Sequence, residues 1–505
     1  MKNNWKWTAA VLCAVGLFKE FVPSAPFLLE YAVEFRNFTS EEVTHEILPV
    51  TTYGYLASLL VLLFITDFLR YKPVILLGGV AAVATWGITI HLYEGMFYAT
   101  LRQIVDSITS ATDIAYLTYM YANVDRQHYK QVTSYTHSAM HTGKFLAGLC
   151  GQLLLSYHVM ELDTINYLSL VGVTMFFITA LFLPNVKRSI YFHPRSSSTV
   201  SRISTIHNSN GNANVPMKKR SNSISQRVVN YPFKKRLNRA LHALWRDFKI
   251  AYFNRYVLRW SLWWSIAFAV YLQIGMYAES LWKEIEDETH EHNLNGAIDA
   301  SHALLSAVFA IVLPYVKLPW ERWGEIYLSF ISLIQGAIIL WMSQTHHLYV
   351  AYICYIIFQT MFHVVIIIAS SEVAESVKED SEAFIFGINT LIALVIQAIL
   401  TILITGEQGF ELGIRDEFVV YGLYSSLLGV IFLLIAIQNR NKHWEVHSQP
   451  EGGCTEHEFS ENVCSGTIVT MSNETKGSVS AVNGIAGVDV KRVGIGVTQD
   501  SNSKY

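Results

Sequence analysis

The sequence predicts an all-α integral membrane protein with twelve transmembrane helices. Hydrophobic residues make up 52% of the 505 residues, whereas Asp, Glu, Lys and Arg together make up only 15%. Soluble proteins carry about 25% of these charged residues. Apolar stretches of about 20 residues, the length that crosses the hydrocarbon core of a bilayer, recur along the chain. The composition therefore excludes an ordinary soluble protein and makes the lipid bilayer the first expected partner.

The twelve expected spans fall into two groups of six. The first group covers residues 8–32, 48–68, 73–93, 98–122, 132–156 and 165–184. The second group covers residues 257–279, 296–316, 323–343, 348–370, 383–405 and 418–438. We therefore expect an N-terminal six-helix half over residues 1–184 and a C-terminal six-helix half over residues 251–438.

The segment between the two halves is expected to be a disordered linker. Residues 185–250 include a Ser- and Asn-rich run that has too little apolar surface to fold. Lys and Arg dominate its charged residues, and basic loops stay on the cytoplasmic side of a membrane. Residues 439–505 are polar and rich in Ser, Gly and Asn, so we expect a disordered cytoplasmic tail there.

We expect a plasma-membrane protein, and the distribution of charge predicts that both of its termini lie in the cytoplasm. An even number of spans on each side of a cytoplasmic linker returns the chain to the cytoplasm. The connection after the first span holds the sequon Asn37-Phe38-Thr39, which is glycosylated only on the luminal or outer side. We therefore expect Asn37 to carry a glycan.

Two carboxylates lie inside the fourth expected span. Asp106 and Asp113 are seven residues apart, so a continuous helix places them on one stripe. An ionisable group near the bilayer centre costs about 2.5–3.5 kcal/mol on insertion scales, so such groups usually face a substrate or ion route. The alternative is that a carboxylate pairs with a base only to hold helices together.

Six spans, a basic connection and six more spans are the outline of a major facilitator transporter, in which two halves rock around a central site. The turn after the second span adds Asp67 and Arg70, which resemble the charge-relay turn of that superfamily. An ordinary positive-inside loop explains the same residues equally well.

Longer motifs carry a more specific resemblance. In the first half these are PSAPFLLEY, NFTSEEVTHEILPVTTYGYL, TDFLRYKPVILL, SATDIAYLTYMY, HYKQVTSYTH and GQLLLSY. In the second half RWSLWW, NGAIDA, YVKLPWERWGE and FGINTLIALVIQ continue the likeness. The chain resembles solute carrier family 19, the reduced folate carriers and thiamine transporters, over about 400 residues. The resemblance implies a major facilitator-like bundle that carries a vitamin.

Within this family, the resemblance implies thiamine rather than folate as the cargo. Folate carriers have an arginine at the position that matches Asp113, whereas thiamine transporters have a glutamate. Folate carriers also place basic residues at the positions that match Gln359 and Gln397, and both are neutral here. A family arginine in the fifth span matches His137. A carboxylate suits the positive thiazolium of thiamine, because ligands of opposite charge need opposite sites.

Four further residues match family positions or offer a suitable side chain near the substrate route. Glu46 matches a family carboxylate, and Asn295 and Asp299 match an asparagine and an acid of thiamine transporters. Tyr116 offers an aromatic ring on which a thiazolium can sit. Each has a plain alternative as a helix cap, an interfacial charge or a helix-packing aromatic.

The fifth expected span has a basic face. His137, His141 and Lys144 follow the i, i+4, i+7 spacing of one helical face. We expect Lys144 to neutralise Asp106 or Asp113 across the interface between the fourth and fifth spans, because an unpaired lysine in a membrane is costly. The alternative is that this face binds an anion.

Motifs of soluble catalysis are missing from the sequence. It contains no P-loop, HExxH or GxSxG motif, and its cysteines show no metal-like spacing. We therefore expect no enzyme activity, no cofactor, no metal and no nucleic acid partner. Three functions stay open: a secondary transporter of thiamine that works by alternating access, the same machine carrying folate or another organic anion, and a membrane receptor or scaffold that does not transport.

Overall fold

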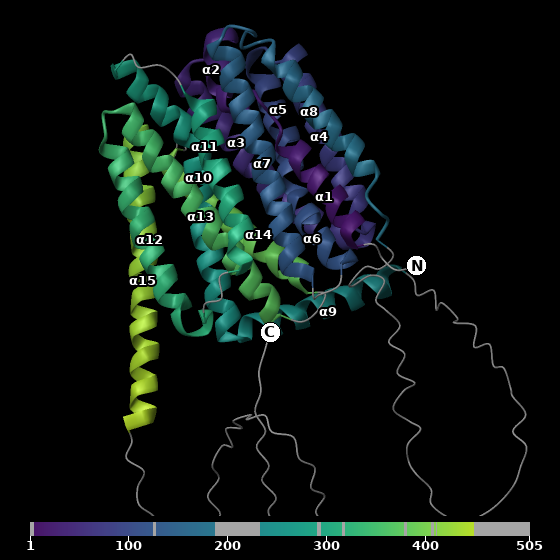
Figure 1. Cartoon of the computed structure of the whole chain (residues 1–505), viewed down its shortest axis with the longest axis vertical. Helices are drawn as coiled ribbons and strands as arrows, with labels where there is room; N and C mark the ends of the chain where they lie inside the picture. The colour runs from purple at the N-terminus through teal and green to yellow at the C-terminus, as the bar shows by residue number, and fades with distance from the viewer. Residues whose placement is uncertain are drawn as a thin grey trace, which may run out of the picture. The chain divides into compact units, whose positions relative to one another are not determined.

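The chain folds into long helices that run alongside one another (Figure 1). The computed structural model describes residues 5–124, 128–186, 233–289, 294–315, 319–377, 381–405, 409–410 and 412–448, and no strand occurs among them. The helices belong to one unit, Met1–His447, which is separate from Ser448–Tyr505.

The helices of the first half begin and end close to the expected spans. They are α1 (Trp5–Glu20), η1 (Ala25–Phe27), α2 (Leu28–Glu30), η2 (Tyr31–Phe35), η3 (Glu42–Ile47), α3 (Leu48–Leu69), α4 (Lys72–His91), α5 (Gly95–Ala111), α6 (Asp113–Asn123), α7 (Tyr129–Ser156) and α8 (Ile165–Leu181). Short helical turns η1, α2 and η2 continue the direction set by α1, so the first expected span consists of several pieces.

The second half begins earlier than its first expected span. Its helices are α9 (Phe233–Phe253), α10 (Arg255–Thr289), α11 (Asn295–Val312), η5 (Leu313–Tyr315), α12 (Trp320–Gln344), α13 (Leu348–Ser376), α14 (Glu382–Ile404) and α15 (Ile414–Ser448). Helix α9 occupies the last part of the segment expected as a disordered linker, and α15 runs ten residues beyond the end of the last expected span. Residues 187–232 lie outside the described part of the chain.

Nine helices in the described ranges are long and apolar enough to cross a membrane. Helix α8 is apolar but has only 17 residues. The fourth expected span is divided into α5 and α6, and α7 is rich in polar residues. The predicted membrane character is thus evident in the structure, while the exact number of twelve spans stays a prediction.

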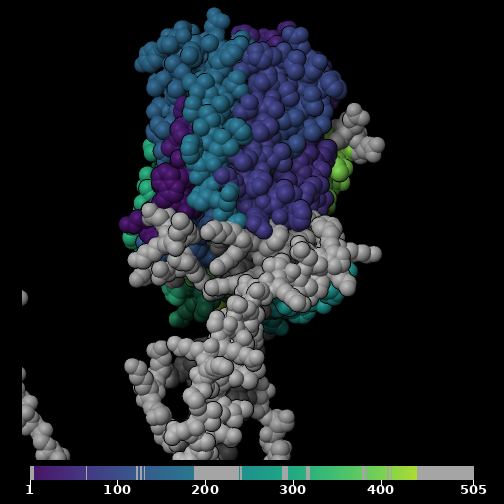
Figure 2. All heavy atoms as spheres, turned by 90° about the vertical axis from the view of Figure 1, so that its right-hand side faces the viewer, coloured from purple at the N-terminus to yellow at the C-terminus, as the bar shows by residue number. Residues whose placement is uncertain are grey.

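Helix α8 carries an apolar stripe on its outer face. Tyr167, Val171, Met175 and Ile178 follow helical spacing and are all exposed. Figure 2 shows this side of the molecule, where α8 lies against α4. Exposed apolar side chains in a continuous stripe are typical of a surface that faces lipid.

The two halves meet through α7 with α11 and through α3 with α14. At the crossing of α7 and α11, a Cβ atom on Gly148 would lie 2.5 Å from the carbonyl oxygen of Gly296. A Cβ atom on Gly296 would lie 2.9 Å from the carbonyl oxygen of Gly148. The two glycines therefore allow the backbones of these helices to touch, as small residues do in membrane bundles.

The helix expected to hold both Asp106 and Asp113 is broken at Thr112. Helix α5 ends at Ala111, and Thr112 has φ −74° and ψ −10°, well away from the ψ of a regular α-helix. The hydroxyl of Thr112 donates a hydrogen bond of 2.7 Å to the carbonyl oxygen of Thr109. Such side-chain bonds to the preceding turn bend helices. The prediction that the two carboxylates share one stripe of a continuous helix was therefore wrong.

The turn between α3 and α4 has an unusual backbone. Arg70 and Tyr71 have φ values of 63° and 66°, a region that residues other than glycine seldom adopt. Tyr71 is buried, and its amide donates to the carbonyl oxygen of Thr66 over 3.1 Å. These contacts fix the turn, which contains Arg70 as expected, while the side chain of Asp67 lies outside the described part of the structure.

Candidate functional site

Two neighbouring cavities lie among the helices and share part of their walls. The smaller has a volume of about 350 Å³ and the larger a volume of about 500 Å³. Both are lined by Glu20, Ser110, Lys144, Tyr271 and Leu272. These five residues come from α1, α5, α7 and α10, so the shared wall includes helices from both halves of the chain.

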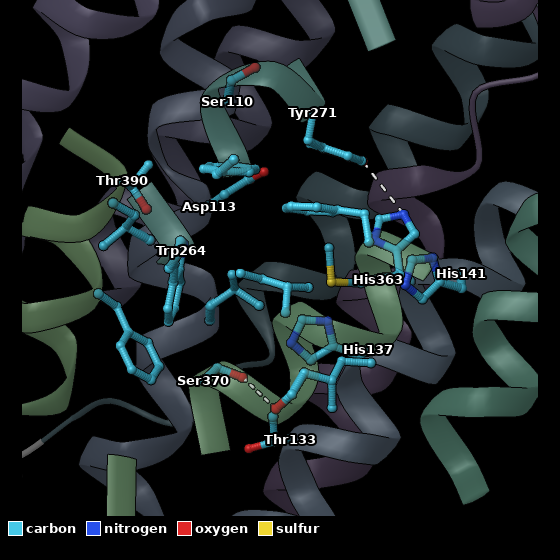
Figure 3. Close-up of a pocket in the computed structure, with 18 of the residues that line it drawn as sticks. Ser110, Asp113, Thr133, His137, His141, Trp264, Tyr271, His363, Ser370 and Thr390 are labelled. Carbon is cyan, nitrogen blue, oxygen red and sulfur yellow. Dashed lines mark hydrogen bonds between the residues drawn. The ribbon is translucent and has the colours of Figure 1, made fainter. Parts of the chain in front are cut away.

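The smaller cavity is lined by histidines and aromatic rings (Figure 3). His141 and His363 face each other with their ring centroids 4.3 Å apart, and the hydroxyl of Tyr271 lies 3.5 Å from Nε2 of His363. Tyr271 also stacks on Phe362 with the ring centroids 4.1 Å apart. Asp113 and His137, both predicted as binding residues, line this cavity.

The larger cavity is more highly charged. Its acidic and basic lining residues are Lys19, Glu20, Arg102, Asp106, Lys144, Glu279 and Asp299. Gln359, predicted from the sequence as a neutral binding residue, also lines it. Asp106 and Asp113 thus line different cavities, and Ser110 between them lines both.

Lys19 connects two carboxylates at the shared wall. Its Nζ atom lies 2.9 Å from Oε1 of Glu20 and 3.0 Å from Oδ1 of Asp113. Helix α1 brings the lysine to the start of α6, where Asp113 is the first residue. The side chain of Lys19 is only 10% exposed, so two carboxylates satisfy one buried ammonium group.

Lys144 pairs with Asp299, and the predicted partners Asp106 and Asp113 were wrong. Nζ of Lys144 lies 3.4 Å from Oδ2 of Asp299, and Nε2 of His302 lies 3.2 Å from Oδ1 of the same carboxylate. The reason is that α7 lies along α11, so residues near its middle face the second half of the chain rather than α5.

Asp106 was also predicted to take part in an ion pair. Among the residues that the structure describes, no ion pair includes it, and its carboxylate is one of the groups lining the larger cavity. Its predicted partner, Lys144, is held by Asp299 instead.

Carboxylates outnumber bases around the two cavities. The acids are Glu20, Asp106, Asp113, Glu279 and Asp299, and the bases are Lys19, Arg102 and Lys144. When all five acids are ionised and the histidines are neutral, the five acids and three bases leave an excess of two negative charges. The walls of the cavities are therefore suited to a ligand that carries positive charge.

Four other predicted residues do not line either of these cavities. Tyr116 is fully buried, and its hydroxyl donates to the carbonyl oxygen of Leu12 over 2.9 Å, which ties α6 to α1. Asn295 accepts a hydrogen bond of 3.2 Å from the hydroxyl of Tyr352. Gln397 donates to the hydroxyl of Thr52 over 3.3 Å, which joins α14 to α3. Glu46 is exposed in η3.

The predicted glycosylation residue lies on the surface. Asn37 follows η2, is exposed and has a φ of 57°. Thr39, the third residue of the sequon, forms a capping box with Glu42, whose Oε2 accepts the amide of Thr39 over 2.8 Å. The sequon therefore lies in an exposed turn just before η3.

Sequence reasoning missed Lys19, Glu20 and Glu279. The signal for the first two was present, because a Lys-Glu pair inside the first apolar span is as costly as Asp113 inside the fourth. Glu279 lies at the very end of its expected span, where a carboxylate is ordinarily taken as interfacial. The pairing of Lys19 with Asp113 was hidden, because only the packing of α1 against α6 brings these two residues together.

Two kinds of comparison identify relatives of the chain. The family model described as Reduced folate carrier matches residues 3–420. Thiamine transporter 1 of Homo sapiens is 34% identical over 453 residues, which cover 86% of this chain and 90% of that protein. Folate transporter 1 of Caenorhabditis elegans is 31% identical over 430 residues, which cover 85% of this chain and 91% of that protein.

Among solved structures, the crystal structure of a POT family transporter in complex with a thioalcohol-conjugated peptide is similar in fold. It matches with a TM-score of 0.55 at 14% identity and covers 85% of this chain and 96% of its own. This likeness confirms the predicted all-α, major facilitator-like architecture of a multi-pass membrane protein. Because the family model and the relatives extend over most of its length, the chain belongs to the reduced folate carrier family.

Proposed function

We propose that the chain is a secondary-active vitamin transporter and that thiamine is its cargo. The observation that carries this proposal is the excess of carboxylates around the two cavities. Thiamine has a permanently positive thiazolium ring, whereas folates are anions. A site with five acids and three bases attracts the first and repels the second. The similarity to Thiamine transporter 1 of Homo sapiens supports the same choice.

The aromatic lining of the smaller cavity also supports an organic cation. Trp264, Phe268, Tyr271 and Phe362 line this cavity, and Phe268 and Phe362 have nearly parallel rings whose centroids are 6.0 Å apart. A desolvated cation over an aromatic face gains about 2 kcal/mol. We propose that Asp113 and His137 contact the cargo in this cavity, and that Gln359 and the Lys144–Asp299 pair contact it in the larger one.

Uptake of labelled thiamine tests the proposal. Cells that express the chain should accumulate labelled thiamine above control cells, and excess unlabelled thiamine should abolish the gain while excess folate should not. Thiamine accumulation no higher than in control cells, together with strong folate uptake, would assign the alternative cargo. Accumulation of neither vitamin at normal surface expression would favour the receptor or scaffold function.

One observation favours the alternative of folate. Lys19, Arg102 and Lys144 all line the larger cavity, and Arg102 forms no ion pair with the described acids. Its guanidinium instead donates to Thr89 and Gln103 and lies 5.7 Å from the centroid of the Trp86 ring. A carboxylate of folate that bound to the Arg102 guanidinium would compete only with the uncharged side chains of Thr89 and Gln103.

We also propose the membrane arrangement expected from the sequence. The two halves, residues 1–184 and 251–438, would move against each other in the plasma membrane, with both termini, residues 185–250 and residues 439–505 in the cytoplasm. The basic character of residues 185–250 and the exposed sequon at Asn37 support this orientation. Epitope tags placed in residues 187–232 should be labelled only after the cells are permeabilised.

A further inference from the structure

One end of the larger cavity combines a carboxylate with two unsatisfied polar groups. Glu279 and Trp282 line it from α10, and Gln359 lines it from α13. Gly275 lies one helical turn before Glu279, and a Cβ atom added there would lie 3.8 Å from Nε2 of Gln359. Residues 275, 279 and 282 of α10 follow the spacing of one helical face. These side chains therefore form one continuous part of the cavity wall.

Glu279 differs from the paired carboxylates that line the two cavities. Glu20 and Asp113 are held by Lys19, and Asp299 is held by Lys144. In the described part of the chain, no ion pair includes Glu279, which accepts a hydrogen bond from the backbone amide of Leu29. Glu279 is therefore a carboxyl group that lines the cavity without an ion-pair partner among the described residues.

Gln359 and Trp282 each present a buried polar atom to this part of the cavity. Gln359 is 2% exposed and Trp282 is 3% exposed. Oε1 of Gln359 and Nε1 of Trp282 have no hydrogen-bond partner among the described residues. A buried donor or acceptor without a partner costs about 1–3 kcal/mol, so a ligand that satisfies both atoms would recover that cost.

The shape of the wall favours a flat ring. Trp282 and Tyr355 meet edge to face with their ring centroids 4.9 Å apart, and both line the cavity. An acceptor and a donor next to aromatic rings match a heterocycle that carries an amino group beside a ring nitrogen. The amino group donates to Oε1 of Gln359, and the ring nitrogen accepts from Nε1 of Trp282.

We propose that Glu279, Trp282 and Gln359 form the recognition site for an amino-substituted heterocycle that carries a positive charge. Gln359 and Trp282 form hydrogen bonds with the amino-heterocycle, and the carboxylate of Glu279 selects a ligand that carries a positive charge. This inference rests on the proposed function, because the aminopyrimidine and the thiazolium of thiamine have these properties. It places the determinants of specificity in the larger cavity rather than at Asp113, which forms an ion pair with Lys19.

Binding of two ligands to the full-length chain in nanodiscs separates the roles of these residues. The ligands are thiamine and its neutral half, 4-amino-5-hydroxymethyl-2-methylpyrimidine. Glu279→Gln should weaken thiamine binding about 10- to 150-fold and leave binding of the neutral pyrimidine unchanged, because only a charge-assisted contact is lost. Gln359→Met should weaken both ligands about 3- to 10-fold, because a neutral hydrogen bond is lost from each.

The matched control is Glu284→Gln on the same helix. Glu284 pairs with Arg415 over 2.9 Å, and its side chain is 41% exposed and outside both cavities. Glu284→Gln should therefore bind both ligands as the wild type does. Glu279→Asp, which keeps the charge, should retain most of the thiamine affinity that Glu279→Gln loses.

A steric variant covers the case in which Glu279→Gln does not fold. Gly275→Leu projects a side chain into the cavity beside Glu279 and Gln359, where the structure offers space. Leucine also favours a helix more than glycine does, so the fold is kept. Gly275→Leu should abolish binding of both ligands at normal thermal stability.

The outcomes separate this inference from the proposed function. Wild-type chain that binds thiamine while Glu279→Gln and Gly275→Leu bind it equally well overturns the recognition site and leaves the thiamine transporter intact. Wild-type chain that binds folate but not thiamine overturns both. If Glu279→Gln also loses binding of the neutral pyrimidine, the assigned role is contradicted. The carboxylate would then maintain the structure of the cavity rather than select for charge.

Discussion

Lys144 on α7 and Asp299 on α11 form an ion pair of 3.4 Å between helices that belong to opposite halves of the chain. Removing one partner of this pair should cost more stability than removing one partner of a surface pair. The reason is that the remaining carboxylate has been taken out of water and no longer has a counter-charge. The pair also adjoins both cavities through Lys144.

The first prediction concerns this pair. Lys144→Met should lower the stability of the purified chain by about 1–3 kcal/mol, less than a fully buried pair would lose because the lysine side chain is 34% exposed. Adding Asp299→Asn should restore most of the loss, because the unpaired carboxylate is removed. Thermal unfolding in detergent measures both effects. Restoration by Asp106→Asn in place of Asp299→Asn would contradict the pairing.

The second prediction concerns Lys19 and its two carboxylates. Asp113→Asn leaves Lys19 paired with Glu20, whereas Lys19→Met leaves both Glu20 and Asp113 without a base. Lys19→Met should therefore reduce surface expression several-fold more than Asp113→Asn does. Flow cytometry with an extracellular epitope measures the difference. Equal expression of the two variants would show that Lys19 does not hold the carboxylates together.

The third prediction concerns the crossing of α7 and α11. In Gly148→Ala, the new Cβ atom lies 2.5 Å from the carbonyl oxygen of Gly296, so the helices must move apart at a cost of about 1–3 kcal/mol. Gly87→Ala on α4 is the matched control, because a Cβ atom there has no other atom within 4 Å. The control should be as stable as the wild type or more stable, since alanine favours the helix. A thermal midpoint of Gly148→Ala equal to that of the control would refute the close contact.

The fourth prediction concerns glycosylation. Asn37→Gln should remove a glycan and increase the electrophoretic mobility of the chain expressed in a eukaryotic cell, because the sequon lies in an exposed turn. The sequence holds a second sequon, Asn473-Glu474-Thr475, in the expected cytoplasmic tail, and Asn473→Gln should leave the mobility unchanged. A shift for Asn473 and none for Asn37 would invert the proposed orientation.

The positions of the helices were predictable from the sequence because the hydropathy of a segment depends only on the residues of that segment. The expected spans at 73–93 and 348–370 agree with α4 and α13 within a few residues at their starts. The break at Thr112 was not predictable in this way, because it depends on one hydroxyl bonding to the preceding turn within an otherwise helical pattern.

Several residues of the site could be predicted from the sequence, but the ion pairs that they form could not. A carboxylate inside a span is visible in the sequence, so Asp113 and Asp299 were both found. The identity of each partner depends on which helices pack together, and nothing in the spacing of Lys144 points to α11 rather than α5. Tyr116 shows the opposite case, because its aromatic ring suggested binding while its hydroxyl bonds to the backbone of α1.

Tyr271 belongs to the wall that the two cavities share, and its ring stacks on Phe362 in only one of them. A rotation of this side chain about its Cα–Cβ bond would therefore change the wall of both cavities at once. Rotamer changes of this kind are much faster than the microsecond-to-millisecond rocking of domains. A ligand that displaces the ring of Tyr271 in one cavity would therefore reshape the other cavity before the halves move.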